Sequence, residues 1–273
     1  MGRGLRSRDG LEHADLEHAD GESPFVQPPR HPPRRRGGLG GRGDRPPLAR
    51  ALPASAAPAP APPAEAEAAA GPVSPQEALR RLTAGNRRWR TYAQEHPHES
   101  ALLRLRLTKA QHPFALVLGC TDSRVPPELV FDQGLGDLMT VRSAGEVLDE
   151  AVLGSVAYGV LELEIPLVVV VGHQSCGAVG AAVHADESGE RLPAHIQYLA
   201  DEIRPAIDHA QQGEARIDAT IDAHARRTRD RLATEPDIAR RIAAGKLEVV
   251  AARYGLRDQR VRTLTGTGLP GGR

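Results

Sequence analysis

The sequence predicts an α/β fold in which a mostly parallel central sheet is flanked by helices. Two short apolar runs, Phe114 to Leu118 and Leu167 to Val171, carry the first part of this prediction, because such runs are typical of strands buried on both faces. Strand and helix patterns alternate along the chain around them. This alternation indicates parallel strands that are joined by right-handed crossovers.

The first quarter of the chain differs in composition from the rest. Residues 1–72 hold most of the prolines, the run Arg34–Arg36 and an Ala/Pro tract at 51–70, so they bury too little apolar surface to offset the entropy of ordering. We therefore expect a disordered tail over residues 1–72 and a folded domain over residues 73–273. The tail could be a basic arm or a transit-like leader, but a merely solvated tail or an over-long translated start is the favoured interpretation.

The folded domain begins with a helix signal. Ser74, Pro75 and Glu77 place serine at the N-cap, proline at the first helical position and glutamate three residues after the cap, which is the pattern of a capping box. We expect this helix to continue through Arg90. The later elements alternate: strands near 114–119, 138–142, 167–171 and 246–251, and helices at 126–132, near 149–162, from Cys176, and on through about 243.

Two polar strings follow the buried runs closely. They are Cys120-Thr121-Asp122-Ser123-Arg124 and His173-Gln174-Ser175-Cys176-Gly177, and they hold both cysteines of the chain. Ligands of open α/β sheets bind beyond the carboxyl ends of the strands, at the topological switch point, so two such strings can converge on one ion if the first and third strands are neighbours. Two thiolates and an imidazole give Zn²⁺ three ligands and leave the fourth position free for water. We predict one zinc ion per chain, bound by Cys120, His173 and Cys176.

Other interpretations of the two cysteines are weaker. A disulfide needs an oxidising compartment, of which the sequence gives no sign, and a cysteine of the core needs no histidine three residues before it. Asp122 can reach the metal itself or the water bound to it. If Asp122 ligates zinc, the site is closed; if it turns away, Arg124 offers a planar fork suited to its carboxylate.

The polar strings resemble the C-x-D-x-R and H-x-x-C-G motifs of β-class carbonic anhydrases, in the same order and at a similar separation. Three further segments are similar to that family: its opening helix, its second-strand region and its last strand resemble residues 79–89, 131–142 and 246–256. The resemblance covers roughly residues 74–264. Ser143, where the family usually has asparagine, and the arginine-rich stretch Arg226 to Arg231 depart from the family pattern.

The resemblance implies a zinc-dependent enzyme that reversibly hydrates carbon dioxide to bicarbonate and a proton. It implies that Asp122, paired with Arg124, accepts a hydrogen bond from the group on the metal, and that Gln133 contacts bicarbonate across a subunit boundary in a homodimer or a dimer-based tetramer. Gly177 begins a helix whose positive end could steady an anion. Hydrolysis of carbon disulfide or carbonyl sulfide on the same ligands, and a non-catalytic or redox-sensing zinc protein, remain as alternatives.

Charge and hydropathy limit the other partners. The formal net charge is +0, which gives no general reason to expect nucleic acid or an acidic membrane as a partner. The longest apolar stretch, Ile165 to Val171, contains Pro166 and is far too short to span a bilayer. No apolar signal-peptide segment follows the N-terminal arginines, so we expect a cytoplasmic protein.

Overall fold

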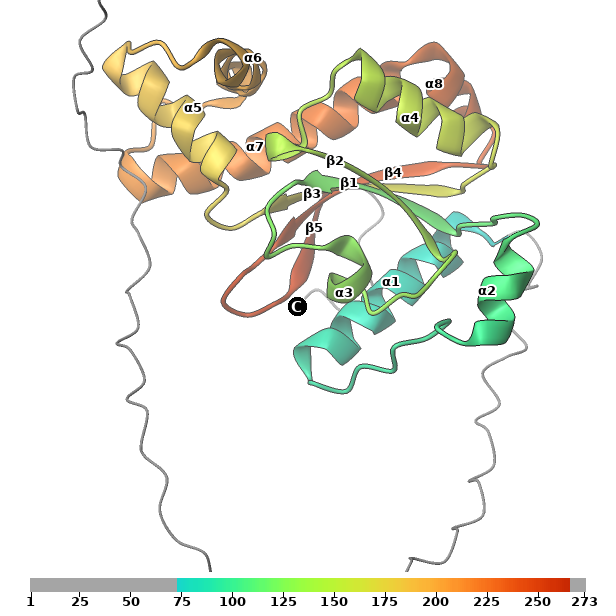
Figure 1. Cartoon of the computed structure of the whole chain (residues 1–273). Helices are drawn as coiled ribbons and strands as arrows, with labels where there is room; N and C mark the ends of the chain where they lie inside the picture. The colour runs from blue at the N-terminus through green and yellow to red at the C-terminus, as the bar shows by residue number, and fades with distance from the viewer. Residues whose placement is uncertain (1–72, 266–273) are drawn as a thin grey trace, which may run out of the picture. The chain divides into compact units, whose positions relative to one another are not determined.

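The computed structural model describes residues 73–265, and the tail expected over residues 1–72 lies outside the described part. The described chain forms a five-stranded sheet with the strand order β2-β1-β3-β4-β5 (Figure 1). The pairs among β1 to β4 are parallel, and β5 pairs with β4 in the antiparallel sense. The strands are β1 (Ala115–Cys120), β2 (Leu138–Ser143), β3 (Leu167–His173), β4 (Glu248–Tyr254) and β5 (Val261–Thr265).

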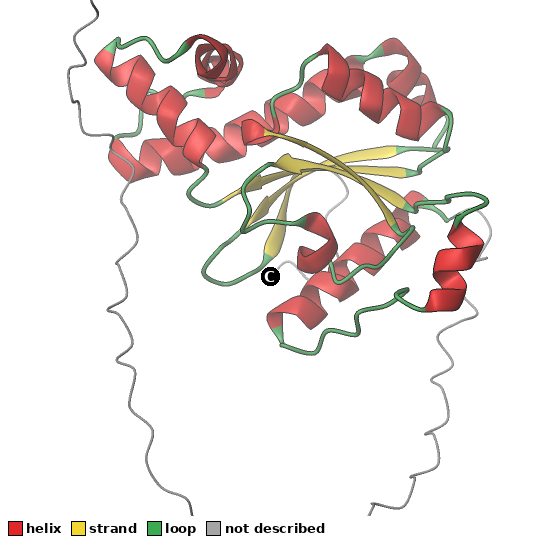
Figure 2. Cartoon of the chain, in the orientation of Figure 1, coloured by secondary structure: helices red, strands yellow, loops and turns green. Residues whose placement is uncertain are grey.

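Helices cover both faces of this sheet (Figure 2). Helices α1 and α3 lie on one side, and α4, α7 and α8 lie on the other. The helices are α1 (Pro75–Arg90), α2 (Ala101–Leu107), α3 (Pro127–Val130), α4 (Glu150–Leu161), α5 (Gly177–Ser188), α6 (Ala194–Ile203), α7 (Gly213–Thr234) and α8 (Pro236–Ala243). None of the helices described between residues 73 and 265 has the length and apolar character needed to cross a membrane.

The side chains of β1 explain why the sheet has two apolar cores. Every residue of β1 is buried, and successive side chains point to opposite faces. Ala115 and Val117 pack into the cluster that includes α1, whereas Leu116 and Leu118 pack into the cluster that includes α4 and α8. The predicted continuous apolar run is therefore a central strand that is covered on both sides, as the α/β prediction requires.

Strands β1 and β3 are direct neighbours, with Leu116 opposite Val168. Strand β2 lies on the outer side of β1, so the chain crosses over between β2 and β3 at this point. The expected topological switch point is thus confirmed at the carboxyl ends of β1 and β3.

Helix α1 starts as predicted, but its cap is only half of a capping box. Ser74 Oγ accepts a hydrogen bond from the Glu77 backbone N–H at 3.2 Å. The Glu77 carboxylate does not return to the cap, because it pairs with Arg80 and with Arg81, the latter at 3.0 Å. The serine thus satisfies one of the free N–H groups of the first turn, while the glutamate forms exposed ion pairs along the helix.

Asn86 ties α1 to the far end of the chain. Its Nδ2 donates to the carbonyl oxygens of Val130 at 3.1 Å and of Gln259 at 3.0 Å. Its Oδ1 accepts the backbone N–H of Val261, at the start of β5, at 3.0 Å. A buried amide therefore uses both ends to connect helix α1 with the end of α3 and with the edge strand and the segment before it.

Two elements were not predicted. Helix α2 buries only Leu103 of its residues, and β5 is a short edge strand with an irregular register against Ala251 and Ala252. The segment 246–256, which resembles the family's last strand, contains β4, and β5 follows it in the chain. The predicted strand near 246–251 is β4, which begins at Glu248 and runs to Tyr254.

The arginine-rich stretch that departs from the family pattern lies in α7 and has a structural use. Arg229 Nε donates to the carbonyl oxygen of Val249 at 2.9 Å, and Arg231 Nη1 donates to that of Leu148 at 2.8 Å. These bonds attach α7 to β4 and to the segment before α4. Two of the arginines therefore hold the helix against the sheet.

Candidate metal centre

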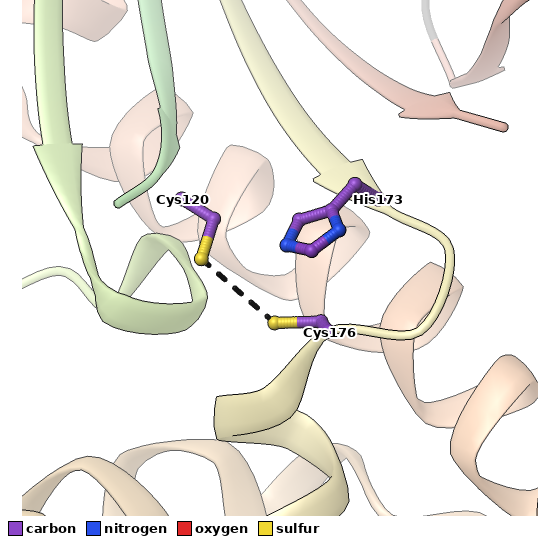
Figure 3. A group of neighbouring side chains, drawn as sticks. All are labelled: Cys120, His173 and Cys176. Carbon is purple, nitrogen blue, oxygen red and sulfur yellow. Dashed lines mark hydrogen bonds between the residues drawn. The ribbon is translucent and has the colours of Figure 1, made fainter. Parts of the chain in front are cut away.

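Three potential ligands meet at the carboxyl ends of β1 and β3. Cys120 ends β1, His173 ends β3, and Cys176 is the N-cap residue of α5 (Figure 3). Their ligand atoms all lie within 4.8 Å of one another, and all three residues are buried. The two Sγ atoms are 3.9 Å apart, and both cysteines are free thiols. Within residues 73–265 this is the group of side chains that could hold a metal ion.

The histidine is oriented for a ligand. His173 Nδ1 lies 2.9 Å from the carbonyl oxygen of Gln174, so Nδ1 carries the proton and donates it. The other ring nitrogen, Nε2, is buried without a hydrogen-bond partner among the described residues. A neutral imidazole fixed at Nδ1 by a carbonyl, with Nε2 left as a free acceptor, is the usual arrangement of a metal-binding histidine. The donor set of one such nitrogen and two sulfurs fits Zn²⁺.

The two thiols are hydrogen-bonded to each other. A hydrogen bond from the Cys176 thiol lowers the pKa of Cys120 to about 4, and the same bond raises the pKa of Cys176. The backbone N–H of Gly145 also points to Cys120 Sγ at 3.3 Å and favours its thiolate form. Because a metal ion binds cysteine as the thiolate, groups that favour the thiolate form of Cys120 also favour metal binding.

Asp122 lies next to this group and is held by Arg124. Arg124 Nε and Nη2 donate to the two carboxylate oxygens at 2.9 and 2.7 Å, and the Arg124 backbone N–H adds a third bond at 2.9 Å. Asp122 Oδ2 is 3.9 Å from His173 Nε2, so the carboxylate stands close to the ligand atoms. These hydrogen bonds from Arg124 hold the pKa of Asp122 at about 2, and Asp122 is therefore an anion over the whole neutral range.

Arg142 fixes the backbone that presents these residues. Its Nε donates to the Cys120 carbonyl oxygen at 2.8 Å and its Nη2 to the Asp122 carbonyl oxygen at 2.7 Å. Cys120 ends β1 and Asp122 lies in the loop after it, while Arg142 lies on the neighbouring strand β2. These contacts give Arg142 a structural role.

An apolar pocket opens beside Cys120. Its walls come from β1, β3, β4 and the segment around α3, and they include Val125, Pro127, Val130, Phe131, Val171 and Tyr254. Tyr254 is anchored by its hydroxyl, which accepts a hydrogen bond from Trp89 Nε1 at 3.0 Å. A pocket with such walls suits a small molecule without charge.

The remaining predicted residues lie as follows. Gln133 follows α3, and its Nε2 donates to the Phe131 carbonyl oxygen at 2.8 Å. Gly177 is the first residue of α5 and directly follows Cys176. Ser143 Oγ donates to the Val147 carbonyl oxygen at 2.7 Å, so the serine finds a partner within its own turn.

Sequence patterns did not reveal two buried polar residues behind the sulfurs. Glu146 follows the Gly145 that contacts Cys120, and it is 1% exposed; His224 lies on α7 and is 3% exposed. A glutamate in a strand-end turn and a histidine in a polar helix both resemble ordinary surface residues in the sequence. Only the packing shows that they are enclosed.

Comparisons with known proteins agree on one family. The family model described as "Carbonic anhydrase" matches residues 115–261. Carbonic anhydrase 2 of Mycobacterium tuberculosis is 40% identical over 190 residues, which are 69% of this chain and 92% of the relative. The carbonic anhydrase of Mycolicibacterium smegmatis is 41% identical over 190 residues, with the same two coverages.

Solved structures show the same fold. The β-carbonic anhydrase CcaA has a TM-score of 0.55 at 27% identity, covering 68% of this chain and 86% of that chain. A structure from the study of two tetrameric β-carbonic anhydrases of Sordaria macrospora has a TM-score of 0.57 at 21% identity, covering 67% and 94%. The second likeness concerns the fold alone.

Proposed function

Because the chain belongs to the β-class carbonic anhydrase family, we propose that this enzyme catalyses the zinc-dependent, reversible hydration of carbon dioxide to bicarbonate and a proton. One observation carries the proposal. His173 Nε2, buried and without a partner, faces two cysteine sulfurs at the switch point, and an apolar pocket opens next to one of those cysteines.

Cys120, His173 and Cys176 would hold one zinc ion per chain. A bound zinc ion supplies Lewis acidity that brings the pKa of a coordinated water from 15.7 to about 7 in carbonic anhydrases, as is established for that enzyme class. Two thiolate ligands donate more charge than imidazoles do, so the corresponding pKa here should be higher. The three side chains leave a fourth coordination position for water.

Asp122 and Arg124 would orient the attacking group. With Arg124 donating to both of its oxygens, Asp122 is turned away from direct ligation and still lies 3.9 Å from His173 Nε2. An anion so placed can accept a hydrogen bond from a water at the fourth position and direct its lone pair towards the pocket. This arrangement supports a catalytic site over a closed structural zinc site, in which Asp122 would be a ligand.

Carbon dioxide would occupy the apolar pocket beside Cys120. Val125, Phe131 and Val171 exclude water from that space and offer no charge to a neutral substrate. Gln133 and Gly177 are further candidates for contact with bicarbonate. Gln133 would act at a boundary between subunits.

We also propose a homodimer or a dimer-based tetramer. Apolar side chains of α2 and of the segment around α3 are exposed, among them Leu105 at 66%, Leu135 at 49% and Leu129 at 47%, and a second copy could cover them. A cytoplasmic location is consistent with two thiols that must stay reduced to bind metal. Light scattering of the purified chain tests the assembly.

The decisive experiment is a stopped-flow assay of carbon dioxide hydration by the purified full chain, with zinc content measured on the same sample. The proposal requires turnover that depends on bound zinc and is lost after removal of the metal. A fully zinc-loaded protein that hydrates no carbon dioxide would refute it. Parallel assays with carbonyl sulfide and carbon disulfide identify the alternative hydrolase activity.

A further inference from the structure

Glu146 is a buried acid. It is 1% exposed, and neither carboxyl oxygen has a hydrogen-bond partner within residues 73–265. Burial, followed by the charge of Cys120, raises the pKa of Glu146 well above its usual range. A carboxyl group in these surroundings stays neutral and therefore carries an O–H donor that needs an acceptor.

His224 offers the complementary group. Its Nε2 lies 2.9 Å from the Gly145 carbonyl oxygen, which can only accept, so Nε2 carries the proton. Burial lowers the pKa of His224 to about 4, and the ring is neutral at physiological pH. Nδ1 is therefore an acceptor, and it too is buried without a partner.

The carboxyl group of Glu146 points to Gly172 of β3, against which α7 also packs. A methyl group at Gly172 of β3 would stand 3.2 Å from Glu146 Oε1 and 3.2 Å from Ile221 Cγ2. It would also stand 3.4 Å from the Cβ of Ala225, the residue after His224 on α7. The acid of Glu146 is thus packed between β3 and the part of α7 that bears His224.

The turn that contains Gly145 and Glu146 has a strained backbone and contacts the metal centre. Gly145 and Glu146 have φ angles of 66° and 44°, and the second is unfavourable for a residue with a side chain. Gly145 is held from two sides: its carbonyl oxygen by His224, and its N–H by Cys120 Sγ at 3.3 Å. This turn persists only if neighbouring groups keep it in place.

We propose that Glu146 and His224 form a neutral hydrogen-bonded pair and act as positioning residues of the metal centre. The acid O–H of Glu146 donates to Nδ1 of His224, either after rotation of the Glu146 side chain or through one buried water. His224 in turn fixes Gly145, whose N–H stays on Cys120 Sγ and draws charge from the thiolate. The inference rests on the proposed metal centre.

The test measures zinc affinity, by competition with a chromophoric chelator, and the thiolate-to-metal absorption bands of the cobalt-substituted full chain. Glu146→Ala and His224→Ala should each weaken zinc binding by about 10- to 100-fold, as is typical for partners of metal ligands, and shift the cobalt bands. The double variant should lose no more than either single one, because the two residues act as a unit. Glu146→Gln keeps an N–H donor for Nδ1 and should restore wild-type affinity and spectrum.

Backbone strain is separated from the acid by Glu146→Gly. This variant relieves the positive φ yet should behave like Glu146→Ala. Glu164→Gly is the matched control: Glu164 also has a positive φ, of 52°, but its side chain is 74% exposed, and its loss should leave zinc affinity and spectrum unchanged.

Unchanged metal affinity and cobalt bands in Glu146→Gly and His224→Ala would overturn the pair, as would additive losses in the double variant. If Glu146→Ala does not fold, the comparison of Glu146→Gln with Glu146→Gly gives the same decision. A wild-type chain that binds neither zinc nor cobalt would defeat the proposed metal centre instead. The two failures are therefore distinguishable.

Discussion

The Arg124 guanidinium donates hydrogen bonds to both carboxylate oxygens of Asp122, and the Arg124 backbone N–H donates a third. The pair lies beside the two sulfurs and the imidazole without using any of their ligand atoms. Asp122 can therefore either stay paired with this arginine or bind at the fourth position of a bound metal ion. The proposed catalytic activity requires that Asp122 stay paired with Arg124.

The first prediction concerns the pH dependence of turnover. The pKa of Asp122 is held at about 2, so protonation of this group cannot explain a change of activity near neutral pH. Competition between Asp122 and hydroxide for the metal can explain such a change, because hydroxide becomes more abundant as pH rises. Activity should be low below neutrality and climb in mildly alkaline buffer. A profile of kcat/KM that is flat from pH 6 to 9 would contradict this.

The second prediction tests the pairing of Asp122 with Arg124. Arg124→Ala should free Asp122 to close the site and move the rise in activity to higher pH. Asp122→Asn should remove closure and also weaken orientation of the attacking group, giving a slower enzyme at high pH with a shallower profile. Arg124→Lys is the matched control for charge, because lysine keeps the cation without the bidentate fork. An Arg124→Ala enzyme with wild-type rate and pH profile would exclude exchange of Asp122.

The third prediction concerns the ligands. Cys120→Ser and Cys176→Ser should lose zinc and activity together, since a serine oxygen is a poor replacement for a thiolate. Elemental analysis and thiol titration measure this. His173→Gln should do the same, whereas His209→Gln, at an exposed histidine paired with Asp186, should leave metal content unchanged. Full zinc occupancy in a cysteine variant would remove that cysteine from the ligand set.

The fourth prediction addresses the apolar pocket. Val125→Phe should fill space beside Cys120 and lower kcat/KM roughly tenfold or more, while zinc content stays at the wild-type level. The comparable change Ile196→Phe adds an aromatic ring to a side chain of α6 that is 48% exposed and should leave kcat/KM unchanged. Equal effects of the two variants would show that the substrate does not use this pocket.

The fifth prediction concerns stability in acid. Burial keeps the pKa of His224 at about 4, below the ordinary histidine pKa of about 6.5, so the unfolded chain binds the proton more tightly than the folded one. The free energy of unfolding should therefore fall as pH drops from 6.5 towards 4, by about 3 kcal/mol at most from this group. Urea unfolding at pH 7 and at pH 5 measures it. His224→Gln should show a smaller fall, and His209→Gln should match the wild type.

The sequence predicted the central strands and the ligand group because local signals specify them. An uninterrupted apolar run such as Leu167–Val171 can only be buried, and a histidine three residues before a cysteine at a strand end suggests a metal. Helix α2 and strand β5 were not predicted from the sequence, because local signals for them are weak. Helix α2 buries only Leu103, and β5 depends on β4 and on Asn86.

The sequence did not identify Glu146 and His224, for a different reason. Their residue types are common on surfaces, and nothing local shows that tertiary packing buries both. The capping box was right about the position of the α1 start and wrong about the glutamate, because Arg80 and Arg81, one turn further on, compete for the same carboxylate. Sequence patterns thus indicate where groups stand, while neighbours that are distant in the chain decide what these groups bind.

The bonds of Asn86 to Gln259 and Val261 span 173 and 175 residues of sequence. The ribosome completes α1 long before it makes these partners. At a synthesis rate of about 5 to 20 residues per second, roughly 10 to 35 s pass between the two events. During that time Ala78, Leu79 and Leu82, which are buried in the finished protein, have no completed sheet to cover them. The bonds that fix α1 to the edge strand therefore form only at the end of synthesis, and a nascent chain halted before Gln259 would lack them.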